Sequence, residues 1–311
     1  MAITATLVKE LREKTSAGML DCKKALEETG GDFEKAIEWL RVKGLSSAAK
    51  KADRVATEGL VQAWMSADRK TGVLVEVNSE TDFVSRNDGF KALVADMAHH
   101  VGSTSGLEGQ GEGSSLMTQT FAKNPSETVD VHLKNAIAKI GENLVVRRYV
   151  RINAKDGFAH TYIHGDGKIG VAVEVTTKST DEAIRTFAND VCLHVAAMSP
   201  ISITADDIPA EMVTKERAVL KAKALEQGKK PEMIDKIVEG QIKKWMAESC
   251  LLEQAFVKNP DQKVKDYMAD VSKKTGQPLS IKQVVRFGLG EGLQKKSNDF
   301  AAEVAAQMKG H

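Results

Sequence analysis

The sequence contains few of the residues and patterns that mark secreted, membrane or disulfide-rich proteins. Its 311 residues include three cysteines, Cys22, Cys192 and Cys250, which are odd in number and far apart. Such cysteines do not predict a disulfide framework, and reduced thiols are typical of cytosolic proteins. The first residues contain no apolar core of a signal peptide, and no apolar run approaches the length that crosses a bilayer. We therefore expect a cytoplasmic protein that does not enter a membrane.

The chain also lacks an excess of charge of either sign. Lys and Arg number 44 against 43 Asp and Glu, which leaves a formal net charge of +1. A protein that binds bare nucleic acid would carry a strongly basic surface, so we expect no direct nucleic-acid partner. Hydrophobic residues make up 42% and charged residues 28%, as in ordinary globular proteins, and the length allows two or three domains.

The residue patterns of common active sites are absent as well. There is no phosphate-binding glycine loop of the Walker type, and the glycines of 288–292 do not have the spacing of the dinucleotide fingerprint. His99 and His100 are adjacent and would point in different directions from a helix, and no cysteine pair has zinc-ligand spacing. We therefore expect no cofactor, no metal and no enzymatic activity. An enzyme whose site is assembled from distant residues is the alternative, and it predicts a deep polar pocket with perturbed titratable groups.

Residues 1–55 form the first predicted unit, a bundle of three short helices followed by a linker. Thr4 has the position of an N-cap, and the run Gly30-Gly31-Asp32 ends the second helix and caps the third. Residues 45–56 carry small and basic side chains, which indicate a linker or a solvated helix. The core of so small a bundle is marginal, which favours docking on another surface.

An internal repeat occupies the middle of the chain. At a constant separation of 98 residues, Gly59, Asp68, Lys70, Gly72, Val73, Val75, Glu76 and Val77 recur as Gly157, Asp166, Lys168, Gly170, Val171, Val173, Glu174 and Val175. Each copy alternates apolar and polar residues on both sides of a turn, and this pattern predicts a β-hairpin followed by a helix. We assign 56–142 to the first copy and 143–208 to the second, and we expect the α+β fold class.

The first copy holds about four more residues than the second between its hairpin and its helix. In the helices, His100 and His194 match at a separation of 94 rather than 98. The surplus falls in residues 78–85, and a loop longer than the architecture needs is a place where function tends to lie. Phe83 either folds back into the core, with Asp82 as a cap, or stands at the loop tip as a wedge for an apolar gap in a partner. His194 is interpreted first as a hydrogen-bonded core residue, because His100 occupies the equivalent position.

The remaining segments complete the predicted fold. The glycine-rich stretch 102–115 has the composition of a flexible loop. Residues 209–262 predict a helical hairpin that projects or dimerises, since its second arm carries a narrow apolar stripe. Residues 263–311 complete the core with a strand at 281–287 and a last helix at 299–308.

These segments carry the motifs of a known family. Residues 3–12 and 17–26, then Thr81-Asp82-Phe83-Val84, then His194-Val195-Ala196-Ala197, and finally 299–306 resemble signatures of bacterial translation elongation factor Ts, in order and at suitable separation. The resemblance covers essentially the whole chain. It implies an N-terminal ubiquitin-associated-like bundle, a duplicated α+β core of hairpin-plus-helix repeats, and an inserted helical hairpin.

The resemblance also implies a function and a partner. Members of the family are guanine-nucleotide exchange factors for the GTPase elongation factor Tu. Asp82 and Phe83, flanked by Thr81 and Val84, would then intrude near the magnesium and phosphate end of the partner's nucleotide site. His194 would contact the same GTPase domain and help to shift its phosphate-binding loop.

Three residues of the N-terminal bundle, Arg12, Met19 and Lys23, would lie on or near its docking face by the same resemblance. A homodimer through the helical hairpin is left open. The alternative function is that of a ubiquitin-associated-like adaptor, which binds a protein partner without exchange activity. A chain with the N-terminal motif but without the 81–84 loop would favour the adaptor, whereas exchange predicts an exposed Phe83 and no deep polar pocket.

Overall fold

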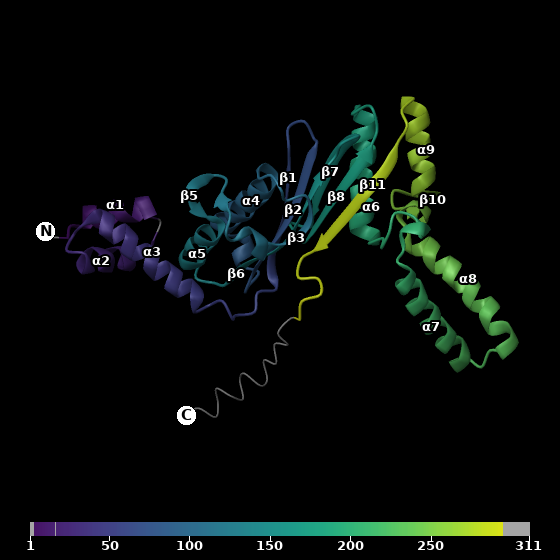
Figure 1. Cartoon of the computed structure of the whole chain (residues 1–311), viewed down its shortest axis with the longest axis horizontal. Coiled ribbons are helices and arrows are strands. Elements are labelled where there is room, and N and C mark those ends of the chain that lie inside the picture. The colour runs from purple at the N-terminus through teal and green to yellow at the C-terminus, as the bar shows by residue number, and fades with distance from the viewer. Residues whose placement is uncertain (1–2, 16, 295–311) are drawn as a thin grey trace.

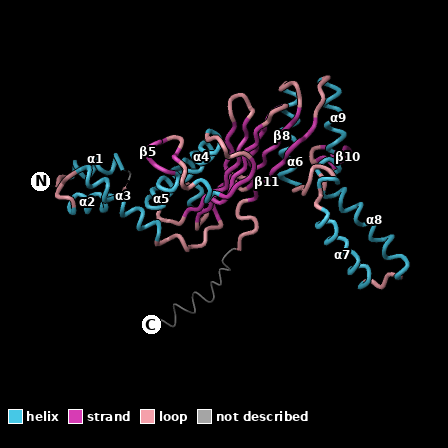
Figure 2. Tube along the Cα trace, in the orientation of Figure 1, coloured by secondary structure: helices cyan, strands magenta, loops and turns pink. Residues whose placement is uncertain are grey.

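The computed structural model describes residues 3–15 and 17–294, and it combines α-helices with antiparallel β-sheets, as the predicted α+β class requires. Figure 1 shows an elongated molecule with the N-terminal helices at one end, the sheets in the middle and a helical hairpin at the other end. The tube in Figure 2 shows the strands gathered at the centre. Among the described residues, no helix is long and apolar enough to span a membrane. The helix expected at 299–308 lies outside the described residues.

The N-terminal bundle consists of α1 (Ala5–Thr15), α2 (Met19–Glu28) and α3 (Phe33–Ala49). The predicted caps are confirmed. The Thr4 hydroxyl accepts the Leu7 N–H at 3.2 Å, and the Asp32 carboxylate accepts the Lys35 N–H at 3.1 Å. Helix α3 continues into the segment expected to be a linker or solvated helix and ends at Ala49.

The first copy of the repeat forms a four-stranded antiparallel sheet in the order β1-β2-β6-β3. Its elements are β1 (Glu58–Met65), β2 (Thr71–Ser79), α4 (Asp88–Ser103), β3 (Gly109–Glu112), β4 (Thr120–Phe121), β5 (Asn124–Thr128), α5 (Val129–Ile140) and β6 (Leu144–Asn153). Helix α4 packs on β1 and β2, and Phe90, Met97 and Val101 on its apolar face are fully buried. Helix α5 joins this core to the bundle, since Gly44 of α3 and Ala138 of α5 approach closely.

The second copy forms a three-stranded sheet in the order β11-β8-β7. Its elements are β7 (Gly157–His164), β8 (Ile169–Thr176), α6 (Glu182–Met198), β9 (Ala255–Phe256), β10 (Asn259–Lys263), α9 (Val264–Thr275) and β11 (Ser280–Gly288). The structure differs from the predicted range 143–208 in two respects. Strand β6 pairs with β2 and so belongs to the first sheet, and the second copy continues beyond the helical hairpin to β11.

A second set of matches extends the duplication through the rest of the core. At a separation of 135 residues, Gln119, Phe121 and Lys123 correspond to Gln254, Phe256 and Lys258. Each set lies in or beside the short hairpin that follows the repeat's helix, β4–β5 in the first copy and β9–β10 in the second. The separation falls from 98 to 94 at the longer first loop and rises to 135 after the inserted helical hairpin, so a search at one fixed separation misses these matches.

The two copies pack against each other through equivalent hydrogen bonds. The Val61 N–H donates to the Gly167 carbonyl at 2.8 Å, and the Ala159 N–H donates to the Arg69 carbonyl at 2.7 Å. The 98-residue repeat relates the two bonds to each other. The donor Val61 corresponds to the donor Ala159, and the acceptor Arg69 corresponds to the acceptor Gly167. The copies are therefore related by a local two-fold symmetry. Apolar residues of both sheets fill the space between them: Val61, Leu74, Val150, Ile152, Ala159, Ala172, Val285 and Phe287.

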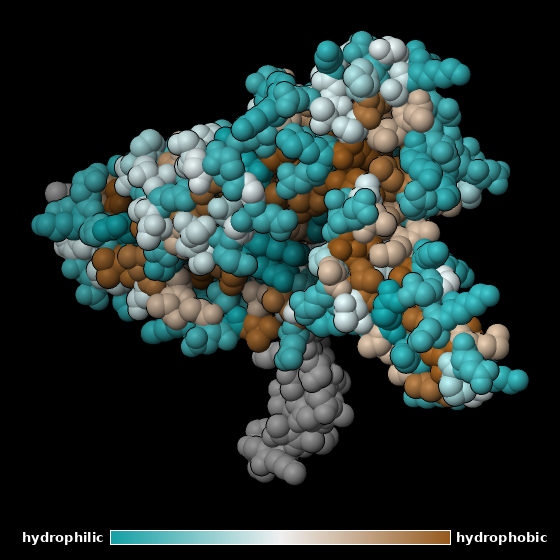
Figure 3. Space-filling view, turned by 45° about the vertical axis from the view of Figure 1, so that its right-hand side comes forward, coloured by the Kyte–Doolittle hydropathy of each residue, from teal (hydrophilic) through white to brown (hydrophobic). Residues whose placement is uncertain are grey.

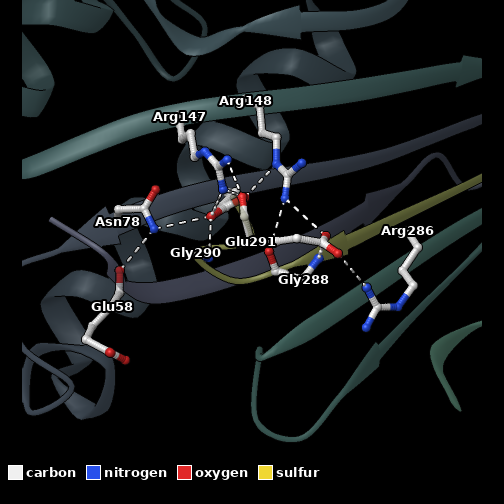
Figure 4. A network of polar contacts seen from close by, with 9 residues as sticks. Glu58, Asn78, Arg147, Arg148, Arg286, Gly288, Gly290 and Glu291 are labelled. Carbon is white, nitrogen blue, oxygen red and sulfur yellow. Dashed lines mark hydrogen bonds and ion pairs between the residues drawn. The ribbon is translucent and has the colours of Figure 1, made fainter. Parts of the chain in front are cut away.

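A buried ionic network fastens the end of β11 to the first sheet (Figure 4). Glu76 of β2 has no exposed surface, and its carboxylate accepts hydrogen bonds from Arg147 at 2.9 Å and from Arg148 at 2.6 Å. The Gly290 N–H, in the loop after β11, donates to the same carboxylate at 2.8 Å. Arg148 also donates to the Gly288 carbonyl at 3.0 Å. The network therefore ties the chain that follows β11 to β2.

Most of the glycine-rich stretch 102–115 is regular structure, and the expectation of a flexible loop over its whole length is wrong. It contains β3, which pairs with β6, and the start of a 3₁₀ helix, η2 (Gly113–Leu116). A Cβ atom on Gly113 would lie 1.9 Å from the Val146 carbonyl oxygen, so no side chain fits there. Gly102 and Gly111 are likewise crowded by neighbouring side chains, whereas Gly106 and Gly109 have positive φ in open space.

The predicted helical hairpin is formed by α7 (Ala210–Glu226) and α8 (Pro231–Ser249), inserted between α6 and β9. The two helices bury a stripe of apolar residues between them: Ala224, Ile234, Val238 and Ile242. Other apolar side chains stay exposed, among them Met212 and Val219 on α7 and Met198 and Ile201 at the base of the hairpin. In Figure 3, hydrophobic surface gathers over the half of the molecule that holds the second copy and the hairpin.

Candidate interface for a protein partner

The connection between β2 and α4 is longer than its counterpart in the second copy. It spans residues 80–87, here called the tip loop, whereas residues 177–181 connect β8 to α6. The prediction of a longer first loop is confirmed. The tip loop contains one turn of 3₁₀ helix, η1 (Val84–Arg86), and ends at Asn87, whose side chain accepts the Phe90 N–H at 3.2 Å and caps α4.

Phe83 stands on the tip loop with 77% of its surface exposed. Its neighbour Val84 is 8% exposed and packs into the core of the first copy. The Arg86 N–H donates to the Phe83 carbonyl at 3.2 Å, and the Asn87 N–H donates to the Val84 carbonyl at 2.9 Å, so the backbone turn is closed behind the ring. The alternative in which Phe83 folds back into the core is wrong. The exposure that a wedge requires is present.

Asp82 places a negative charge beside this ring. Its side chain is exposed and makes no hydrogen bond or ion pair with any residue that the structure describes. The cap expected of Asp82 is not formed, because Asn87 caps α4 and no side chain caps η1. The Asp82 carbonyl instead accepts the Ser85 N–H at 3.2 Å and the Ser85 hydroxyl at 2.6 Å. An uncompensated carboxylate and an exposed ring therefore lie side by side.

The base of the tip loop is held by residues that the sequence prediction did not single out. The Glu142 carboxylate accepts the Thr81 N–H at 3.0 Å and the Thr81 hydroxyl at 2.6 Å. The Ser79 hydroxyl donates to the Thr81 carbonyl at 2.9 Å. Glu142 follows the left-handed Gly141 that ends α5. In the sequence, Glu142 is marked only by its place in a turn just before a strand. Such a turn does not reveal which loop its residues contact.

His194 lies in α6 with no exposed surface. Its Nδ1 accepts the Val257 N–H at 3.1 Å, so Nε2 carries the proton and donates to Gln254 at 2.9 Å. In the first copy, His100 has the two equivalent partners at 3.2 and 3.0 Å, from the chain around β4. This duplication supports the interpretation of His194 as a hydrogen-bonded core residue. Direct contact of its ring with a partner stays a prediction.

The three residues predicted in the N-terminal bundle, Arg12, Met19 and Lys23, are exposed on α1 and α2. Met19 is 52% exposed and its neighbour Leu20 is 82% exposed, so α2 begins with an apolar surface. Lys23 lies 3.8 Å from Glu27 in a surface ion pair. The predicted residues therefore occupy three regions, the bundle, the tip loop and α6, and Figure 1 places α1 and α2 far from α6.

Comparisons with known proteins give the family. The sequence model of the family described as Elongation factor TS matches residues 80–291. The elongation factor Ts of Bdellovibrio bacteriovorus is 56% identical over 316 positions, with 100% of both chains covered. Those of Trichlorobacter lovleyi and Bartonella quintana are 48% and 46% identical, with 98% and 100% of both chains covered. The chain belongs to the elongation factor Ts family. Its role is therefore that of a translation elongation factor.

The part of the chain that matches the elongation factor Ts model includes the duplicated core from the tip loop onward, and strands β1 and β2 lie before it. The tip loop and His194 lie inside the matched range, and the N-terminal bundle lies before it. Among the described residues, no group of three or more histidine, cysteine, aspartate or glutamate side chains is placed to hold a metal ion. The features that distinguish the two copies of the core are the tip loop, the strand β3 and the inserted hairpin.

The two buried histidines make the stability of this protein depend on pH. Burial lowers the pKa of His100 and of His194 below the ordinary value for histidine, against the opposite effect of their glutamine partners. An unfolded histidine titrates near about 6.5, so the unfolded chain takes up protons first. Stability is then complete above about pH 6.5 and is lost as the pH falls toward the folded pKa. We expect the free energy of unfolding in urea to fall by up to about 1.4 kcal/mol per pH unit for each ring.

The control for this prediction is the double variant His100→Gln with His194→Gln. It removes these two rings, so its free energy of unfolding should depend less on pH between about 7 and 5.5. An equal slope in the variant and the native protein would assign the pH dependence to other groups.

Proposed function

We propose that this chain is a guanine-nucleotide exchange factor that promotes the release of GDP from elongation factor Tu. The observation that carries the proposal is Phe83, a large aromatic side chain that is 77% exposed on a loop with a closed backbone. Aromatic residues that become buried on binding supply much of the energy of protein interfaces. The exposed carboxylate of Asp82 brings a negative charge to the same point.

Exchange follows from differential binding. A protein that binds the nucleotide-free GTPase more tightly than the GDP-bound form must weaken the binding of GDP by the same ratio. An apolar wedge near the partner's Mg²⁺ displaces groups that hold the metal, and loss of the metal removes the neutralisation of phosphate charge. This mechanism requires no acid, base or cofactor from the exchange factor. The proposal therefore treats the chain as a binding protein rather than an enzyme, acting in the cytoplasm.

Other exposed surfaces of the chain support the binding of a protein partner at more than one place. The bundle presents Arg12, Met19 and Lys23 as a second contact, on helices α1 and α2. The helical hairpin presents Met212 and Val219 on the exposed face of α7, which fits either the same partner or a second copy of this chain. Several separated contacts would let the factor hold the GTPase while the tip loop distorts its nucleotide site.

Release of a fluorescent GDP analogue from purified elongation factor Tu tests the proposal. Substoichiometric amounts of this protein should accelerate the release, because one molecule of factor acts on many molecules of GTPase. Binding without acceleration would contradict exchange and would favour the alternative, a ubiquitin-associated-like adaptor. Acceleration that requires a stoichiometric amount would indicate sequestration of the nucleotide-free GTPase.

A further inference from the structure

The tip loop is joined to the turn after α5 by a reciprocal pair of carboxylates. Glu142, in that turn, accepts the N–H and the hydroxyl of Thr81 at 3.0 and 2.6 Å. In the opposite direction, Glu80 in the tip loop accepts the Asn143 N–H at 2.6 Å. Each segment therefore donates a backbone N–H to a carboxylate of the other. Hydrogen bonds to a charged acceptor are stronger than those between neutral groups, so this clamp is a firm connection.

The same network reaches the linker of the N-terminal bundle. The Asn143 side-chain amide donates to the Arg54 carbonyl at 2.7 Å and to the Ala52 carbonyl at 3.3 Å. The Arg54 guanidinium lies 3.4 Å from the Glu80 carboxylate. Asn143 is only 3% exposed, so water does not compete for these bonds. The linker, the turn and the tip loop are thus one hydrogen-bonded unit.

The second copy of the core has the same turn without the clamp. The left-handed glycine that ends α5 has a counterpart at the end of α9. By this alignment, Glu142 and Asn143 correspond to Gln277 and Pro278. Pro278 has no N–H to donate, and among the described residues no hydrogen bond joins its turn to the 177–181 connection. The clamp therefore occurs only in the copy that carries the longer loop.

We propose that Glu142 and Glu80 are positioning residues, which hold the tip loop in the conformation that presents Phe83 and Asp82 before the partner arrives. This inference rests on the exchange function proposed above. Thr81 is two residues from the ring, and its N–H, carbonyl and hydroxyl are all hydrogen-bonded. A loop that is ordered before binding loses less conformational entropy in the complex. More of the interaction energy then remains to distort the nucleotide site.

Glu142→Ala removes the two carboxylate oxygens that accept hydrogen bonds from the Thr81 N–H and hydroxyl. Two measurements on this variant test the inference. In the free protein, tip-loop amides should exchange with deuterium roughly tenfold faster. GDP release from elongation factor Tu at saturating factor should slow by about tenfold, with little change in the half-saturating concentration, because the other contact surfaces are intact. Glu142→Gln keeps one acceptor oxygen and should give intermediate values. Gln277→Ala, at the equivalent position of the second copy, is the matched control and should change neither quantity.

The outcomes separate the inference from the function on which it rests. Unchanged deuterium exchange in Glu142→Ala would overturn the clamp. Faster deuterium exchange with a normal rate of GDP release would overturn the positioning role, while the native protein's activity would still support exchange. A large fall in melting temperature with normal GDP release per folded molecule would assign Glu142 to stability and also overturn the role. Inactivity of the native protein would defeat the proposed function, and the positioning role with it.

Discussion

Phe83→Ala should reduce the acceleration of GDP release by about thirtyfold to a hundredfold. An aromatic residue at the centre of an interface contributes about 2–3 kcal/mol when it is truncated, and each 1.4 kcal/mol corresponds to about a factor of ten. The ring is 77% exposed in the free protein. The free energy of unfolding should therefore change by less than about 0.5 kcal/mol. Stopped-flow release of a fluorescent GDP analogue, together with urea denaturation, measures both quantities.

The control for this prediction is Val42→Ala, which truncates another exposed apolar side chain, 57% exposed on α3. It should leave both the rate of GDP release and the stability nearly unchanged. Phe83→Leu keeps an apolar side chain and should retain part of the activity. If Phe83→Ala unfolded the protein while GDP release per folded molecule stayed normal, Phe83 would be a structural residue and the wedge idea would be wrong.

Features that depend on neighbouring residues could be predicted from the sequence. Thr4 and Asp32 cap their helices because a cap involves groups within one turn. The two hairpins follow from alternating side chains on both sides of a turn. The length of the tip loop follows from comparing the two copies. That comparison pointed to this loop as a place for function but left two interpretations of Phe83 open, because no local pattern could establish its exposure.

Features that depend on which distant segments meet could not be predicted. Strand β6 follows α5 and precedes β7, so its place in the chain does not indicate that its partner is β2. Glu142 and Thr81 are 61 residues apart, and nothing in either local sequence indicates their contact. Gly113 has the composition signal of a loop, although it lies against the Val146 carbonyl. In each case the missing information was the tertiary contact itself.

Glu76→Ala should lower the free energy of unfolding by about 3 kcal/mol, because breaking a buried ion pair leaves its partners without compensation. The variant leaves the guanidinium groups of Arg147 and Arg148 and the Gly290 N–H without their acceptor. The two arginine side chains are 20% and 24% exposed, so water reaches them in part. This access places the expected loss at the lower end of the range for buried pairs. Urea denaturation at neutral pH measures it.

The duplicated core supplies a matched control for this prediction in Glu174→Ala. Glu174 occupies the equivalent position, but its carboxylate has one charged partner, Lys282 at 3.0 Å, whose side chain is 54% exposed. After the substitution the lysine remains hydrated, so we expect a loss of about 1 kcal/mol. Both variants remove the same side chain from equivalent strands, and the difference between them isolates the network in Figure 4. Equal losses would mean that the two arginines and the loop after β11 add nothing to stability. A larger loss for Glu76→Ala would establish that this network holds the two halves of the core together.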